Sequence, residues 1–300
     1  MIPIRDDNPT RKRQYVTVAL IVAMVLIYLY TDSLNRWGRA MVMLGFGAIP
    51  AVLSGDSQLA YSLRYLPKIL TPITSLFLHT DIFHIGGNAL FLWIFGSRVE
   101  GVMGHGRYLL FFLLCGIGGV ALQIYATPGL QVPIVGSSSA IAGILGAYLL
   151  LFPYARVLVW LPPFWPPFRA PALIYIGLWI AYQFSNSLVS DPHLGGTGYL
   201  VHVGGFLAGL ALLPLLKERD VRLWQPPQPW PPPAAAEGAP SADGAAPVAT
   251  VGEGARAPLA SPLPPGSAPV AEGAIEAQGH TGPHTGPHPR PGAEDQPPPG

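Results

Sequence analysis

The feature that most constrains the fold of this chain is a series of long apolar runs. Half of the 300 residues are hydrophobic and only 11% are charged, which leaves too little polar surface for a soluble protein of this size. A helix needs about 20 mostly apolar residues to cross a bilayer, and polar flanks can extend a shorter run. We therefore predict an all-α membrane protein with six transmembrane helices. The expected spans are residues 15–30, 82–95, 108–126, 134–151, 172–184 and 199–216.

The distribution of basic residues predicts the orientation of these spans. Arg11, Lys12 and Arg13 precede the first run, which no small-residue cleavage site follows, so we interpret that run as a retained anchor. Lys and Arg are most frequent in the segments on the same side as the N-terminus. Because cytoplasmic loops carry an excess of Lys and Arg, both termini are predicted to be cytoplasmic. The domain prediction is a cytoplasmic segment over residues 1–14, a membrane domain over 15–217 and a disordered tail over 218–300.

Three segments outside the spans have distinct compositions. Residues 33–70 form a long, partly apolar connection, which we expect to rest in the membrane interface. Residues 161–168 contain four prolines and cannot form a regular helix, so they are predicted to be an interfacial connector. The tail is rich in Pro, Ala and Gly, and its short histidine repeat over residues 280–288 indicates low complexity rather than a metal site.

Composition also argues against several classes of protein. The formal net charge is only +1, and no basic stripe with interleaved aromatic residues occurs, so nucleic-acid binding is not expected. Cys115 is the only cysteine, which rules out an intramolecular disulfide and a cysteine-cluster metal site. We interpret Cys115 as a small apolar packing residue.

Polar residues interrupt three of the expected spans at similar positions. His84 and Asn88 lie in the second span, Ser138 follows Gly136 at the start of the fourth, and His202 lies early in the sixth. Polar side chains inside membrane helices carry a solvation cost, so they indicate a functional site. These three spans run in the same direction, and their polar residues should share one depth near the extracytoplasmic face.

The residue types favour acyl-transfer chemistry. A serine hydroxyl is a poor nucleophile without a nearby base, and His202 can supply that base to Ser138. The backbone N–H of Ser138 and the side chains of His84 and Asn88 can donate to a tetrahedral oxyanion. No acid occurs between Glu100 and Asp191, which predicts a dyad rather than a triad.

Each of these residues also has a structural interpretation. Ser138 can cap a helix, and both histidines can be interfacial hydrogen-bonding residues. Ser137 and Ser139 compete with Ser138 for the role of nucleophile, and the residues alone do not choose among the three. Small residues in the fourth and sixth spans would let the two helices approach closely, and the GxxxG pair Gly205 and Gly209 is a common packing pattern.

At these residues the sequence resembles the rhomboid family of intramembrane serine proteases. Residues 74–88 are similar to the family's HxxxxHxxxN signature, residues 136–139 to its GxSx serine motif and residues 202–209 to its histidine-bearing sixth span. Residues 46–50 resemble the first loop of bacterial members, and the likeness extends over about residues 15–217.

The resemblance implies a six-helix rhomboid-like bundle and a role for each site residue. Ser138 would be the nucleophile, His202 the base, and His84 with Asn88 the oxyanion donors. The implied substrates are single-span transmembrane proteins in the lipid bilayer, with no cofactor and no metal. We expect a multi-pass protein of the bacterial inner membrane, and the sequence does not indicate its oligomeric state.

Two departures and two alternatives accompany this resemblance. Ser139 stands where the family often has Gly, and Ala142 stands where some relatives place a tyrosine against the histidine ring.

The main alternative is a non-catalytic rhomboid-like protein that binds transmembrane helices, although such proteins lose the serine or the histidine. The other is a small-solute transporter, which the lack of an intramembrane acid and of broken repeats disfavours.

Overall fold

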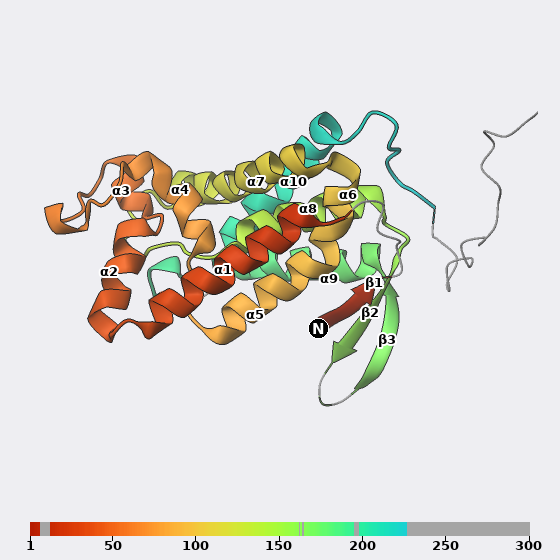
Figure 1. The fold of residues 1–300 in the computed structure, drawn as a ribbon, viewed down its shortest axis with the longest axis horizontal. Coiled ribbons are helices and arrows are strands. Elements are labelled where there is room, and N and C mark those ends of the chain that lie inside the picture. Colours follow the sequence, from red (N-terminus) through yellow and green to blue (C-terminus); the bar gives the residue numbers. More distant parts are fainter. Residues whose placement is uncertain (7–12, 162, 164, 195–197, 227–300) are drawn as a thin grey trace, which may run out of the picture. The chain divides into compact units, whose positions relative to one another are not determined.

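A computed structural model gives the fold of the chain (Figure 1). It describes residues 1–6, 13–161, 163, 165–194 and 198–226. Most of the predicted tail, including the histidine repeat, lies outside these residues. The tail prediction began at residue 218, yet the Glu218 N–H donates to Val102 O at 3.0 Å and the Trp224 N–H to Leu150 O at 2.8 Å. The chain is thus still bonded to the helices several residues beyond that boundary.

The structure is mostly helical, and four helices are long and apolar enough to cross a membrane. They have 18 to 22 residues each and correspond to the first, third, fifth and sixth predicted spans. They are α1 (Tyr15–Ser33), α7 (His105–Ala126), α9 (Ala172–Val189) and α10 (Tyr199–Leu216).

The second and fourth predicted spans have a different form. Helix α5 (Ile82–Phe91) continues through a π-helical turn, η4 (Leu92–Gly96), into α6 (Ser97–Met103), so the helical path is unbroken but its hydrogen-bonding pattern changes. Helix α8 (Ser138–Leu151) has only 14 residues, and most of its side chains are buried. By length and composition the structure therefore supports four spans among the described residues, and the prediction of six depends on these two shorter elements.

Small residues bring α8 against α10, as the sequence suggested. A Cβ on Gly205 would overlap the carbonyl oxygen of Ser139, and a Cβ on Gly209 would overlap that of Gly143. The two backbones are thus in direct contact, which only glycine permits at these positions. This contact holds the start of α8 beside the start of α10.

The predicted long loop contains short helices rather than irregular chain. The Asn35 side chain caps the first of them by accepting from the Gly38 N–H at 2.8 Å. The loop ends in two further turns that lead into α5. The elements are α2 (Arg36–Phe46), α3 (Pro50–Ser54), η1 (Tyr61–Leu63), η2 (Lys68–Leu70), α4 (Thr71–Thr74) and η3 (Ser75–Phe77).

A three-stranded antiparallel sheet lies at one end of the helices (Figure 1). Strand β1 (Ile2–Asp6) pairs with β2 (Arg156–Leu161), which pairs with β3 (Trp165–Pro171). The proline-rich connector is therefore part of a hairpin, and Pro166 and Pro167 lie on the edge strand β3, where a missing N–H costs little. The sequence prediction contained neither the hairpin nor β1.

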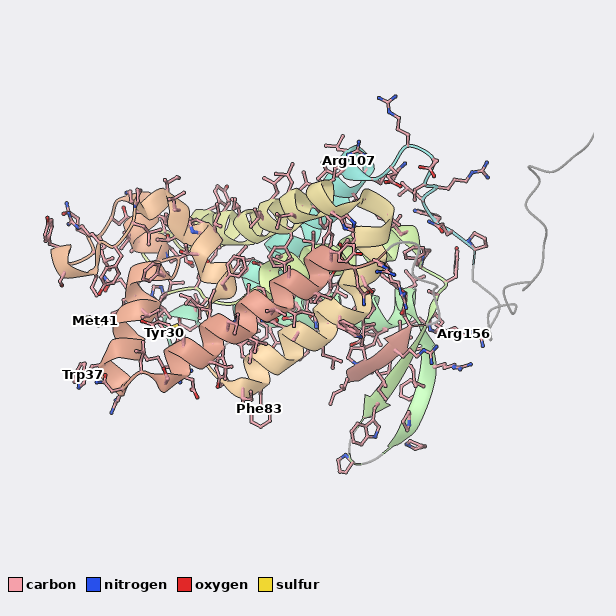
Figure 2. The ribbon with its side chains drawn as sticks, in the orientation of Figure 1. Tyr30, Trp37, Met41, Phe83, Arg107 and Arg156 are labelled. Atoms are coloured by element: carbon pink, nitrogen blue, oxygen red, sulfur yellow. The ribbon has the colours of Figure 1, made fainter. Side chains whose placement is uncertain are left out.

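The two ends of the helices differ in their side chains. Figure 2 shows Arg107 and Arg156 toward the end that carries the sheet, whereas Trp37 and Met41 lie toward the other end. Trp37 is 81% exposed. The remaining short element, the 3-10 turn η5 (Pro192–Leu194), precedes α10.

Candidate active site

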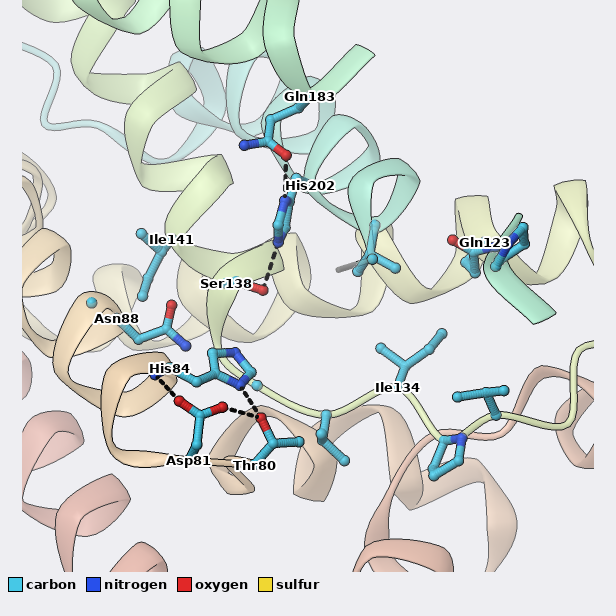
Figure 3. A pocket seen from close by; sticks show the side chains of 18 of the residues that line it. Thr80, Asp81, His84, Asn88, Gln123, Ile134, Ser138, Ile141, Gln183 and His202 are labelled. Carbon is cyan, nitrogen blue, oxygen red and sulfur yellow. Dashed lines mark hydrogen bonds between the residues drawn. The ribbon is translucent and has the colours of Figure 1, made fainter. Parts of the chain in front are cut away.

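Ser138 and His202 lie within hydrogen-bonding distance of each other. Ser138 is the first residue of α8, and His202 lies in the first turn of α10, where the glycine contacts hold the two helices together. Ser138 Oγ is 2.8 Å from His202 Nε2, and His202 is buried (Figure 3). A hydroxyl in this position donates its proton to a ring nitrogen whose lone pair is free.

The neighbouring serines face other groups. Ser139 Oγ donates to Gly116 O on α7 at 3.4 Å, so the hydroxyl that departs from the family pattern points away from His202. Ser137 Oγ is buried and has no hydrogen-bond partner among the described residues. Of the three serines that the sequence left open, Ser138 is the one bonded to the imidazole.

His84 and Asn88 lie one helical turn apart on α5 and face Gly136, the residue before the three serines. A Cβ built on Gly136 would be 2.6 Å from His84 Nε2 and 3.7 Å from Asn88 Nδ2. Asn88 Nδ2 is buried and has no hydrogen-bond partner in the described structure. A buried donor without a partner is costly, and a bound oxyanion would satisfy it.

The start of α5 is fixed by the two residues that precede it. Asp81 caps the helix by accepting from the N–H groups of Phe83 and His84, each at 2.9 Å. Thr80 Oγ1 lies 2.9 Å from Asp81 Oδ2 and 3.1 Å from His84 Nδ1. These bonds, led by the one from the His84 N–H, lower the pKa of the Asp81 carboxyl below its ordinary value of 3.8.

Proton counting limits what His84 can donate. The Thr80 hydroxyl carries one proton and donates it to Asp81, so it accepts the Nδ1–H of His84. The Nε2 atom of a neutral His84 is then an acceptor, and it becomes a donor only in the imidazolium form.

His79 packs against the His84 ring. Its ring lies edge-on to His84, with centroids 5.1 Å apart. Burial, followed by the proximity of His84, lowers the pKa of His79 to about 4, so this ring is neutral near pH 7. Because His79 is itself buried, it packs against His84 without adding charge to the site.

All four predicted residues border one cavity of about 780 Å³ (Figure 3). Its walls come from several helices and from the segment before α8, and they mix polar and apolar side chains. Among the lining residues are Asp81, His84, Asn88, Gln123, Ser138, Trp179, Gln183 and His202.

Sequence reasoning missed two residues that contact His202. Gln183 Oε1 on α9 is 2.9 Å from His202 Nδ1, and the Trp179 ring centroid is 5.9 Å from that of the imidazole. The sequence signal for Gln183 is its place inside the apolar run of residues 172–184, because a polar side chain within a membrane helix carries a solvation cost.

Comparison with known proteins gives the family. A model of the rhomboid domain matches residues 67–219, just over half of the chain. The chain is 28% identical over 153 residues to the yeast "Rhomboid protein 1, mitochondrial", which covers 49% of this chain and 41% of that protein. It is 34% identical over 146 residues to "Rhomboid protease GluP" of Bacillus subtilis (48% of this chain, 26% of the relative).

A third relative is "Rhomboid-type serine protease 2" of Emericella nidulans, 35% identical over 143 residues (47% of this chain, 25% of the relative). The chain thus spans less than half the length of each of these three proteins. The matched residues include α5, α8 and α10, which carry His84, Asn88, Ser138 and His202. With half of its length matched by the domain model, this apolar helical chain belongs to the rhomboid family.

Proposed function

We propose that this protein is an intramembrane serine endopeptidase that hydrolyses peptide bonds in or near the transmembrane segments of other membrane proteins. The observation that carries this proposal is the 2.8 Å contact between Ser138 Oγ and His202 Nε2, inside a cavity that His84 and Asn88 also line. The names of the three relatives, two of which are called proteases, support a hydrolase.

The proposed reaction begins with attack by Ser138 on the scissile carbonyl carbon. His202 takes the hydroxyl proton at Nε2, and the carbonyl oxygen becomes an oxyanion. The proton on His202 then passes to the leaving amine, and an acyl-enzyme on Ser138 remains. Water enters the cavity, His202 accepts one of its protons, and the resulting hydroxide attacks the acyl carbon. The bond from that carbon to Ser138 Oγ then breaks, His202 returns the proton to Oγ, and the acyl group leaves as a carboxylic acid.

The three proposed oxyanion donors differ in whether they depend on a protonation state. The Ser138 N–H is at the start of α8, where backbone donors have no helical partner, and Asn88 Nδ2 is an unpartnered donor. Both donate at any pH in the working range. His84 joins them only when it is protonated, because its Nδ1–H is already directed to Thr80.

The proposed arrangement in the membrane has six spans, with α5–α6 and α8 as the second and fourth, and both termini in the cytoplasm of a bacterial cell. The short α8 is tolerated because other helices surround it, so its backbone end opens into a cavity rather than into lipid. Single-span membrane proteins are the proposed substrates, and they enter from the bilayer.

Replacement of the nucleophile tests the function. Purified full-length protein with Ser138→Ala or His202→Ala is expected to lose cleavage of a model transmembrane substrate, while its thermal unfolding stays close to wild type. Loss of the nucleophile or of the base leaves only the contribution of the oxyanion site, so a fall of at least about a thousandfold is expected. The control is Ser137→Ala, which removes a hydroxyl one residue away that does not contact His202.

Labelling separates the enzyme from a non-catalytic helix-binding relative. A fluorophosphonate should label the wild type and the Ser137→Ala variant but not Ser138→Ala. Full cleavage by Ser138→Ala, or the absence of both labelling and cleavage in the wild type, would refute the proposed function.

A further inference from the structure

The proposed base has a second buried partner, and that partner comes from a different helix. His202 Nδ1 is 2.9 Å from Gln183 Oε1, and both side chains are buried. Figure 3 shows Gln183, His202 and Ser138 in a line, with the imidazole between the other two. Gln183 is therefore a third polar group, hydrogen-bonded to the imidazole of the predicted dyad.

The protons of this line have one consistent arrangement. An amide oxygen only accepts, so the bond to Gln183 Oε1 requires a proton on His202 Nδ1. In a neutral imidazole the other nitrogen then carries the lone pair, and Nε2 accepts the Ser138 hydroxyl proton. The alternative tautomer would place a proton on Nε2 and leave no base for the serine.

Helix α9 presents Gln183 to the site while its neighbours face outward. Gln183 is 6% exposed, whereas Tyr182 and Phe184 are 58% and 53% exposed. Trp179, one turn earlier on the same face, lies against the His202 ring at a tilt of 33°. Residue 142 on α8 is an alanine and has no ring to offer, whereas α9 supplies both the amide and the aromatic contact to His202.

Chemistry explains why an amide would serve here. An imidazolium forms when His202 takes the serine proton, and an acceptor at Nδ1 stabilises it. A carboxylate would do this more strongly, but a buried charge inside the membrane is expensive before the reaction begins. A glutamine accepts the same hydrogen bond without that cost.

We propose that Gln183 is a positioning residue for the reaction, which fixes the His202 tautomer and ring orientation from α9 and makes the working unit Ser138–His202–Gln183. This inference rests on the proposed function. Gln183 does not touch the substrate or the reacting atoms, and it acts only through the imidazole.

Three variants of the full-length protein test the inference. Gln183→Leu keeps the apolar bulk but removes the acceptor, Gln183→Glu restores an acceptor, and Asn186→Leu is the matched control. Asn186 is an amide on the same helix whose Nδ2 donates to Tyr182 O at 2.8 Å within α9. The measurements are kcat and KM for a model transmembrane substrate, the pH–rate profile, the rate of fluorophosphonate labelling and thermal unfolding.

Gln183→Leu is expected to lower kcat and the labelling rate by about ten- to a hundredfold, the effect of losing one buried hydrogen bond, with KM unchanged. Gln183→Glu should recover most of the labelling rate and move the acidic limb of the pH–rate profile to higher pH, because a carboxylate favours the protonated imidazole. Asn186→Leu should match the wild type. A purely packing role for Gln183 would not move the pH–rate profile.

Two results would overturn the inference. One is a folded Gln183→Leu protein with wild-type kcat and labelling rate. The other is a Gln183→Glu protein whose pH–rate profile coincides with that of the wild type. This second comparison tests the inference even if the Gln183→Leu protein fails to fold. Ser138→Ala measured in parallel separates the two proposals: if it is inactive while Gln183→Leu is normal, only the positioning role fails, and if it is fully active, the proposed function fails as well.

Discussion

At the scale of single residues, the site depends on one backbone conformation. Gly136 has a φ of +111°, a region that residues with a Cβ rarely adopt, and its N–H donates to Ser75 O at 2.8 Å. Because Gly136 has no side chain, no Cβ crowds His84 Nε2 and Asn88 Nδ2. The motif therefore needs glycine for both its conformation and its lack of a side chain.

Gly136→Ala is expected to lower kcat by about a hundred- to a thousandfold, the usual effect of losing an oxyanion donor, because the new methyl group would displace His84 Nε2. The strained φ adds a stability cost of about 1–2 kcal/mol. The rate of fluorophosphonate labelling and thermal unfolding measure the two effects. Gly129→Ala is the control, because a Cβ there would meet no atom within 4 Å. Wild-type activity of Gly136→Ala would contradict the proposed oxyanion site.

At the scale of elements, α5 is capped by the residue before it and is followed by a π-helical turn. Asp81 caps the helix that presents His84 and Asn88, and η4 changes its hydrogen bonding one turn beyond Asn88. A single π-helical turn of this kind re-aims the side chains that follow it. The cap therefore fixes the end of α5 that carries His84, whereas the π turn lies among the buried residues that follow α5.

The Asp81 cap predicts an acid-dependent stability. The pKa of the folded carboxyl lies below 3.8, so its contribution is fully present above about pH 4 and is lost as the pH falls through the folded pKa. Asp81→Asn should keep the cap but remove this carboxyl's share of the pH dependence, whereas Asp81→Ala should cost about 1 kcal/mol near pH 7. Thermal unfolding of the three proteins between pH 7 and about pH 3 measures both effects. Parallel curves for wild type and Asp81→Asn would show that the carboxyl does not contribute.

At the scale of the whole described bundle, the N-terminal strand is tied to two helices far along the chain. Asp6 is buried and accepts from the Arg98 guanidinium at 2.8 Å and from the Tyr148 hydroxyl at 2.9 Å. One carboxylate thus joins β1, α6 and α8 at the end of the bundle opposite Trp37. The sheet is therefore part of the folded membrane domain.

Asp6→Ala is expected to destabilise the protein by about 3 kcal/mol, because it leaves the Arg98 charge without its carboxylate in a mostly buried position. Thermal unfolding in detergent measures the change, and Asp6→Asn should be intermediate, since it keeps the shape but not the charge. Ile4→Ala is the control on the same strand, where the side chain is 43% exposed. An unchanged unfolding temperature for Asp6→Ala would show that β1 does not hold the helices.

Much of the fold class and the whole set of proposed motif residues followed from local sequence. Apolar runs reveal long helices because burial in lipid depends on composition, and polar residues inside them are conspicuous for the same reason. The second and fourth spans were harder, since a π turn and a short, enclosed helix both depend on neighbours that a linear pattern does not contain. For this reason four helices of the described residues, rather than the six predicted, are long and apolar enough to cross a membrane.

Other features were decided only by the tertiary structure. The residues alone did not choose among Ser137, Ser138 and Ser139, and only the resemblance implied Ser138; the fold decides that the Ser138 hydroxyl meets His202 and that the Ser139 hydroxyl meets Gly116 O. Gln183 and Asp6 look ordinary in sequence, because their partners lie 19 and 92 or more residues away. Sequence by itself determined which residue types occupy the membrane, through solvation, whereas the pairing of His202 with Gln183 and of Asp6 with Arg98 came from helix packing, through short-range hydrogen bonds that only the folded chain can form.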